Sequence, residues 1–71
     1  MPTPREIGQR LRELRGEMPR ENVAKACGIS VSALSMYENG SRIPRDEIKI
    51  RIANYYKLSV QRIFFMNKWH V

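Results

Sequence analysis

Apolar residues recur along this chain at helical spacing in several separate stretches. The first stretch is defined by three apolar residues, three or four positions apart: Ile7, Leu11 and Leu14. Residues at this spacing share one face of a helix. Thr3, Pro4 and Glu6 precede them, and a capping threonine, a proline at the first helical position and an acid soon after indicate a helix start. This helix is expected to end near Arg15, before Gly16.

The stretch from Arg20 to Asn39 predicts two short helices joined by a tight turn. The earlier helix begins at Met18-Pro19 and turns three small or apolar side chains inward: Val23, Ala24 and Cys27. Gly28 stands where this helix must stop, because a left-handed backbone costs glycine almost nothing. Ser30 is a good cap for the later helix, since its hydroxyl can accept from an otherwise unpaired amide.

The later helix is expected to span about Ser30 to Glu38, with Leu34 and Tyr37 on its inward face. Two short helices around a glycine-centred turn are typical of a helix-turn-helix. The second helix of such a motif lies in the major groove of DNA, so this one is the candidate recognition helix.

A fourth helix is expected over about Arg45 to Tyr56, with acids at Asp46 and Glu47 in its first turn, where the helix dipole favours them. Its apolar residues cover more than one face: Ile48, Ile50, Ile52, Ala53, Tyr55 and Tyr56. Such a helix buries two sides, or one side and an interface. Ser59 can cap a last short helix, Val60 to about Phe65. Without any strand pattern or repeat, the sequence predicts an all-α fold.

The composition indicates what kind of partner the chain binds. The 71 residues suit one small domain, and 13 lysines and arginines against 7 acids give a net charge of +6, which favours a polyanionic partner. The lone cysteine, Cys27, excludes an internal disulfide and is expected to be a buried apolar group. The chain has no long uncharged run of the kind that marks a signal peptide or a membrane span, so a cytoplasmic protein is expected.

Several motifs together resemble one family. They are Ile7-Gly8-x-Arg10-Leu11-Arg12-x-Leu14-Arg15, then Gly28-Ile29-Ser30-x-x-x-Leu34-Ser35-x-Tyr37-Glu38-Asn39-Gly40, Arg42-x-Pro44, Ser59-Val60 and Ile63-Phe64. The chain is similar, from about Ile7 to Phe64, to the Cro and lambda-repressor-like helix-turn-helix regulators of bacteria and phages. The resemblance implies a compact five-helix DNA-binding domain over residues 3–65, a short tail over residues 66–71, and a dimer on an inverted repeat.

Candidate DNA contacts follow from the recognition helix. With Leu34 and Tyr37 inward, the residues expected to face base edges are Val31, Ser32, Ala33 and Met36. The residues expected to hold phosphates flank that helix: Arg20, Ser35, Asn39, Arg42 and Arg45. Many members of the family carry a phosphate-holding glutamine at the position of Arg20. The remaining basic residues considered are expected to lie on plain surface: Arg5, Arg10, Arg12, Lys49 and Arg51.

The tail leaves two readings open. Phe65, Met66 and Trp69 would form one exposed patch if the last helix continues that far, and such a patch is typical of a dimer interface. Alternatively, Trp69 folds back over a groove of the first helix and enlarges the small core.

No enzyme motif, phosphate-cradling glycine loop or metal-ligand cluster occurs, so no catalytic residue, metal or other cofactor is expected. His70, the one histidine, is assigned neither a catalytic nor a metal role. The leading hypothesis is a sequence-specific regulator on double-stranded operator DNA, expected to be a homodimeric repressor of phage or mobile-element type, with no small-molecule ligand. The alternative is an antitoxin-like or adaptor module that binds another protein through the same fold.

Overall fold

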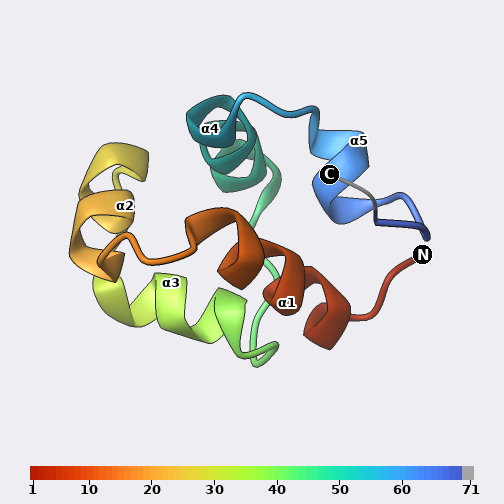
Figure 1. The fold of residues 1–71 in the computed structure, drawn as a ribbon, viewed down its shortest axis with the longest axis horizontal. Coiled ribbons are helices and arrows are strands. Elements are labelled where there is room, and N and C mark those ends of the chain that lie inside the picture. Colours follow the sequence, from red (N-terminus) through yellow and green to blue (C-terminus); the bar gives the residue numbers. More distant parts are fainter. Residues whose placement is uncertain (70–71) are drawn as a thin grey trace.

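The computed structural model describes residues 1–69, and this part of the chain forms helices joined by short loops, without a strand (Figure 1). The helices are α1 (Pro4–Arg15), α2 (Arg20–Cys27), α3 (Val31–Glu38), α4 (Asp46–Tyr56) and α5 (Val60–Phe64). The all-α prediction is confirmed. Four boundaries differ by one or two residues. Helix α2 begins at Arg20, after Met18-Pro19, and α3 begins at Val31, after Ser30. Helix α4 begins at Asp46, after Arg45, and α5 ends at Phe64, before Phe65.

Local capping chemistry begins three of the five described helices. At α1 the Thr3 hydroxyl accepts from the Glu6 amide at 3.1 Å, and the Glu6 carboxylate accepts from the Thr3 amide at 2.8 Å. Hydrogen bonding of the Glu6 carboxylate to the Thr3 amide, and then to the Thr3 side chain, holds the pKa of Glu6 below its ordinary value. Ser30 accepts from the Ala33 amide at 3.0 Å, and Ser59 caps α5 in the same way. The predicted caps are therefore confirmed.

The turn between α2 and α3 depends on a left-handed glycine. Gly28 has φ 70° and ψ 34°, and its amide donates to the carbonyls of Ala24 and Lys25. The next amide, that of Ile29, donates to the Ala24 carbonyl at 2.9 Å and closes the turn. Cys27, directly before it, is buried, and its burial raises the pKa of the thiol. The predicted left-handed turn at Gly28 and the predicted burial of Cys27 are both confirmed.

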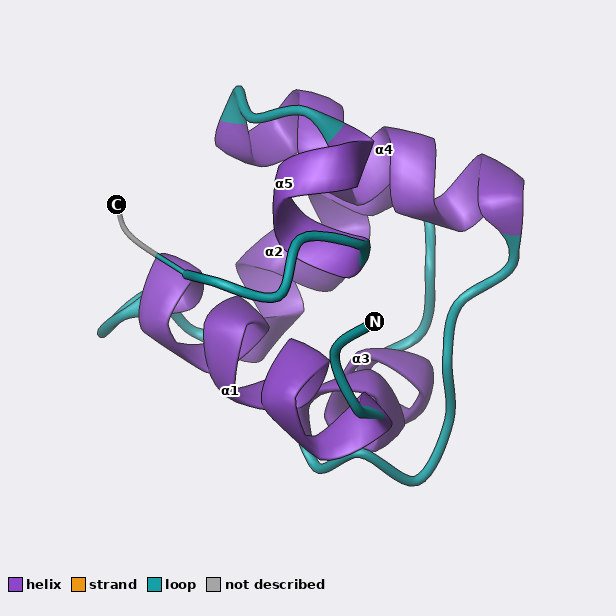
Figure 2. Cartoon of the chain, turned by 90° about the vertical axis from the view of Figure 1, so that its right-hand side faces the viewer, coloured by secondary structure: helices purple, strands orange, loops and turns teal. Residues whose placement is uncertain are grey.

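The core joins all five of these helices around one apolar cluster: Ile7, Leu11, Val23, Ala24, Cys27, Leu34, Tyr37, Ile52, Ala53, Ile63 and Phe64. Helices α1 and α3 lie side by side, as both ribbon views show (Figure 1, Figure 2). Gly8 makes this approach possible, because a Cβ there would lie 2.3 Å from the carbonyl oxygen of Glu38. The close contact ties α1 directly to the backbone at the end of α3.

Lys49 corrects one expectation about the surface. Its side chain is only 13% exposed, and its ammonium lies 5.8 Å and 4.9 Å from the ring centres of Phe64 and Phe65. An ammonium at these distances is attracted to the ring faces while its stem packs on apolar surface. Lys49 therefore joins α4 to the end of α5, whereas Ile50 on the same helix is 51% exposed.

Arg10 corrects a second expectation. It is 3% exposed, and its guanidinium donates to the carbonyls of Ile63 at 2.9 Å and Asn67 at 3.1 Å. A longer contact of 3.5 Å reaches the Arg62 carbonyl. Predicted as plain surface, Arg10 instead fixes the end of α5 and the tail against α1.

The tail follows the second reading of the sequence. The chain after α5 passes over α1 (Figure 2), and Trp69 is half-buried against the core. Its indole nitrogen donates to Glu13 at 2.7 Å, and Arg10 lies 5.4 Å from its ring centre. Because α5 ends at Phe64, no continued helix places Trp69 beside Phe65 and Met66.

Candidate nucleic-acid interface

Helix α3 exposes two of the four side chains predicted to meet bases. Val31 is 40% exposed, Ser32 is exposed, and Met36 is half-buried. Ala33 is also half-buried, and unlike Met36 it packs against the core cluster. Ala33 lies one helical turn before the buried Tyr37, so it faces partly toward the core, and its contact with bases stays a prediction.

The residues predicted to hold phosphates follow α3 in the chain, apart from Arg20 and Ser35. Arg42 and Arg45 are exposed, and within residues 1–69 no ion pair holds either of them. The side-chain oxygen of Asn39 accepts from the amide of Ser41 at 2.9 Å and from its hydroxyl. These bonds hold the loop after α3 and use the side-chain oxygen of Asn39. The amide nitrogen of this exposed side chain remains as a donor.

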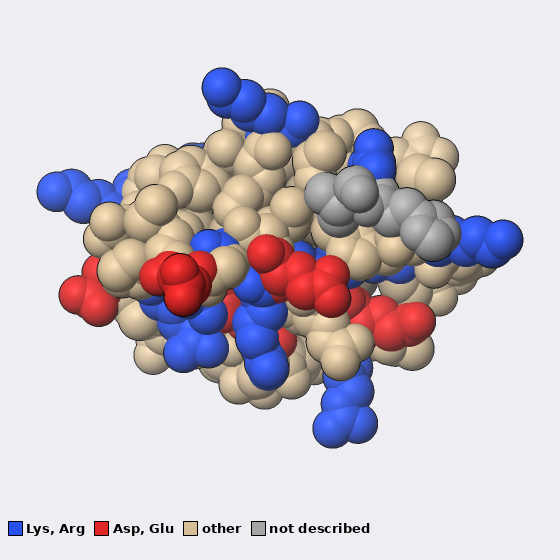
Figure 3. Space-filling model, viewed as in Figure 1, with Lys and Arg blue, Asp and Glu red and all other residues tan. Residues whose placement is uncertain are grey.

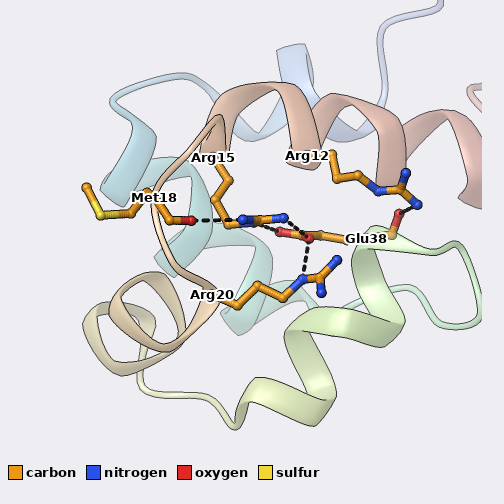
Figure 4. A network of polar contacts seen from close by, with 5 residues as sticks. All are labelled: Arg12, Arg15, Met18, Arg20 and Glu38. Carbon is orange, nitrogen blue, oxygen red and sulfur yellow. Dashed lines mark hydrogen bonds and ion pairs between the residues drawn. The ribbon is translucent and has the colours of Figure 1, made fainter.

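A buried glutamate at the end of α3 draws arginines from two other helices (Figure 4). The side chain of Glu38 is 0% exposed. Its Oε2 accepts from Arg15 Nε at 2.8 Å, and its Oε1 accepts from Arg15 Nη2 at 3.0 Å and from Arg20 Nε at 2.9 Å. Arg12 Nη2 lies 3.5 Å from the Glu38 carbonyl oxygen. We call Arg12, Arg15, Arg20 and Glu38 the Glu38 cluster.

The guanidinium groups of this cluster differ in how fully they are engaged. Arg15 binds the carboxylate with two nitrogens, and its third donates to the Met18 carbonyl at 2.8 Å. The paired hydrogen bond with Glu38 raises the pKa of Arg15 above its ordinary value. Arg20 contributes only its Nε, and its side chain is 40% exposed. Arg15 is therefore built into the fold, whereas Arg20 keeps donors at the surface.

Tyr56 borders the same cluster from α4. Its hydroxyl is buried without a hydrogen-bond partner in the described residues. Burial, and then the negative charge of Glu38, raise the pKa of this hydroxyl well above its ordinary value. A neutral hydroxyl is thus retained beside the ion pairs.

The ion pairs of this cluster were not predicted, although the sequence carries a signal for them. Leu34, Tyr37 and Glu38 stand at helical spacing, so Glu38 shares the inward face of α3. A buried carboxylate needs a cation and hydrogen bonds around it. The sequence offers several arginines within reach, and only the packing of α1 and α2 selects Arg15 and Arg20 among them.

The surface around this region is mixed rather than uniformly basic. In the space-filling view, acidic and basic side chains alternate over α1, and several basic side chains project toward the edge where Figure 1 places α3 (Figure 3). Within residues 1–69 no group of three or more potential ligands could hold a metal ion. None of the helices described is both long and apolar enough to cross a membrane. His70 lies outside the described residues.

Known proteins share this fold. A family model described as helix-turn-helix (HTH_3) matches residues 9–63. The restriction-modification controller protein C.AhdI from Aeromonas hydrophila aligns with a TM-score of 0.78 and 27% identity, over 86% of this chain and 96% of that one. The clp gene regulator ClgR from C. glutamicum aligns with a TM-score of 0.72 and 26% identity, over 89% of this chain and 86% of that one. No curated protein matches the sequence.

Proposed function

This chain belongs to the Cro and lambda-repressor-like helix-turn-helix family of DNA-binding transcriptional regulators, and we propose that it acts as a homodimeric repressor on operator DNA. The restriction-modification controller and the clp gene regulator support regulation as its role. Repression of phage or mobile-element genes, and action in the cytoplasm beside the chromosome, are the finer parts of this proposal.

The observation that carries the proposal is the exposed side of α3 with basic residues before and after it. Arg20 at the start of α2 and Arg42 and Arg45 after α3 supply cations that can bind the DNA backbone. Lysines and arginines that neutralise phosphates provide most of the sequence-independent affinity of a DNA-binding protein. The net charge of +6 agrees in sign with such a partner.

Sequence preference would come from the outer side of α3. Ser32 can donate to or accept from base edges, while Val31 and Met36 can pack on thymine methyl groups. Ala33 is half-buried, packs against the core and carries only a methyl group. We therefore assign base contact to Val31, Ser32 and Met36 first, and expect Ala33 to contribute only a close backbone approach.

The homodimer would use the surface after α5. Phe65 and Met66 are 39% and 45% exposed, and Lys49 stacks on the Phe65 ring. Exposed aromatic and methionine side chains are enriched at the centres of protein interfaces. Trp69 packs against the core and donates to Glu13 of α1, so the proposed interface rests on Phe65 and Met66. A two-fold pair would set two α3 helices about 34–36 Å apart, one turn of DNA.

A salt titration of DNA binding tests the proposal. With roughly four phosphate contacts in each subunit, a dimer should show a slope of log affinity against log salt near −7, on the rule of about −0.9 per phosphate. The measurement needs no known operator, because a duplex library of random sequence reports the electrostatic part and selection from it yields the preferred site. A slope indistinguishable from zero would favour the alternative, an antitoxin-like or adaptor protein that binds another protein.

A further inference from the structure

The two exposed side chains assigned to the dimer surface lie on a segment that α1 holds at two points. Arg10 donates to a carbonyl before Phe65 and Met66 in the chain, at 2.9 Å, and to a carbonyl after them, at 3.1 Å. We propose that residues 65–69 form a latch, and that its closure on α1 positions Phe65 and Met66 for a second copy of this chain. The inference rests on the proposed homodimer and deepens it, because it names the contacts that prepare its surface.

The backbone after α5 does not fix this segment by itself. The helix ends at Phe64, and the amides of Phe65 and Met66 both donate to the Gln61 carbonyl at 2.9 Å. Within residues 1–69, no further bond between backbone groups holds the chain beyond Met66. The path of residues 67–69 therefore depends on side-chain contacts, and the partners are on α1.

Trp69 closes the latch at its far end. Its indole nitrogen donates to Glu13 at 2.7 Å, and the Arg10 guanidinium lies 5.4 Å from its ring centre, where the chain has passed over α1 (Figure 2). A pocket of about 120 Å³ remains between α1 and the tail, with Gln9 and Asn67 in its lining. It has room for several water molecules, each of which takes about 30 Å³ in the liquid. A contact made of few polar bonds beside such a pocket opens more easily than a packed core.

Phe65 also contacts α4, which does not depend on the latch. The Lys49 ammonium lies 4.9 Å from the centre of the Phe65 ring. An open latch leaves residues 67–69 without their contacts to α1, and Met66 without a fixed neighbour in the chain. A second copy must then order these residues as it binds, at a cost in conformational entropy that a closed latch has already met.

A two-fold dimer contains two latches, so any effect on the latch counts twice. When only a fraction of the molecules is competent to bind, the apparent dissociation constant rises by the inverse of that fraction for each chain. A variant that lowers the closed fraction about threefold therefore weakens the dimer about ninefold. Linkage also works in reverse, so formation of the dimer must favour the closed latch.

A purely structural role is the competing explanation, in which Trp69 only enlarges the small core. Trp69→Phe separates the two explanations, because it keeps an aromatic ring for packing and removes the N–H that reaches Glu13. Glu13→Ala removes the acceptor of the same bond. Glu17→Ala is the matched control, since Glu17 is an exposed acid whose carboxylate makes no hydrogen bond or ion pair within residues 1–69.

The experiment measures the dissociation constant of the dimer by sedimentation equilibrium for W69F, E13A, their double variant and E17A, with a melting curve for each. We expect W69F and E13A each to raise the constant about tenfold, as for loss of one hydrogen bond in each of two latches, and E17A to stay within about twofold. The double variant should be no weaker than either single variant, because each substitution removes the same bond.

Fluorescence gives a second readout, because Trp69 is the one tryptophan of the chain. In the unchanged protein, the emission of Trp69 should change on dilution at the concentration where sedimentation shows the dimer dissociating, since latch and dimer are linked. The E13A variant should show this change at a higher protein concentration, and E17A at the same concentration as the unchanged protein.

Three results would overturn the inference. The first is an unchanged dissociation constant in W69F and E13A, with or without a lower melting temperature, and the second is additive effects of these two substitutions. The third is an unchanged protein that stays monomeric at every concentration, which removes the homodimer and the latch together. Met66→Ser separates the two proposals: if M66S abolishes the dimer while E13A leaves it intact, the homodimer stands and the latch is excluded.

Discussion

Arg10 and Arg15 lie on the same helix, and each guanidinium crosses to the C-terminal end of another helix. Arg10 meets neutral carbonyl oxygens in the last turn of α5 and just after it, and Arg15 meets the carboxylate at the end of α3. At the end of α5, which we call the tail end, Arg10 is almost completely buried. At the end of α3, in the Glu38 cluster, one carboxylate also gathers Arg20, which remains partly exposed.

The type of oxygen that accepts the hydrogen bonds explains why Arg10 is buried while Arg20 remains partly exposed. Carbonyl groups at a helix terminus carry partial negative charge and satisfy one guanidinium, while the indole face of Trp69 covers it. A carboxylate carries a full charge and several lone pairs, so it can accept from two arginines and leave donors of one at the surface. An arginine fully spent on carbonyls stabilises the fold, whereas one that shares a carboxylate can also bind an anion.

Replacing Arg10 should give the largest effect. Arg10→Met leaves the Ile63 and Asn67 carbonyls without their donor, and we expect a loss of about 3–5 kcal/mol of unfolding free energy, since charged hydrogen bonds contribute about 1.5–3 kcal/mol each. Urea denaturation measures it. Arg12→Met is the matched control on the same helix, with a loss of about 0.5 kcal/mol or less. Equal losses of unfolding free energy for Arg10→Met and Arg12→Met would remove the distinction between the tail end and the Glu38 cluster.

Gly8→Ala tests how closely the two helices at the Glu38 cluster approach. The new Cβ would lie 2.3 Å from the Glu38 carbonyl oxygen and 2.9 Å from that of Tyr37, so α1 and α3 must move apart. We expect a loss of about 3 kcal/mol, at the upper end of ordinary overpacking, read from thermal melting. The variant should also reduce DNA affinity, because the arginines of α1 move away from Glu38. Unchanged melting would contradict the close backbone contact.

Tyr56→Phe should stabilise the protein at the edge of the cluster. The buried hydroxyl has no partner within residues 1–69, so its removal should add about 1 kcal/mol. The raised pKa of Tyr56 also gives a pH dependence. Above about pH 10 the unfolded chain releases this proton first, so the wild-type protein loses stability as the pH rises, and the variant lacks this loss.

Urea denaturation at pH 8 and pH 10.5 measures both parts of that prediction. Tyr55→Phe serves as the control, since Tyr55 is 36% exposed. A loss of stability in Tyr56→Phe at pH 8 would mean that its hydroxyl has a favourable partner.

Met36→Ala should have the smallest effect on the fold. Met36 is half-buried and lies outside the core cluster, so its loss should change stability by about 1 kcal/mol or less. Binding-site selection should instead show a relaxed preference at about one or two base pairs. If the variant unfolds, Met36 contributes to the core and α3 is rotated from the assignment made above.

Local signals in the sequence determined the helices and the turn. The caps at Thr3, Ser30 and Ser59 and the left-handed Gly28 act within a few residues, so their geometry follows from nearby chemistry alone. The burial of Cys27 follows from helical periodicity in the same way. The position of α3 and the exposure of Val31 and Ser32 on it were predictable for this reason.

Tertiary packing alone decided the partners of the long side chains. Arg10, Arg12, Arg15 and Arg20 look alike in sequence, yet one binds the tail, two bind a buried acid and one reaches a carbonyl. Trp69 bonds to a residue far away in the chain. A flexible side chain can reach many acceptors, and the crossing of α1 over α3 and the path of the chain after α5 determine which one it meets.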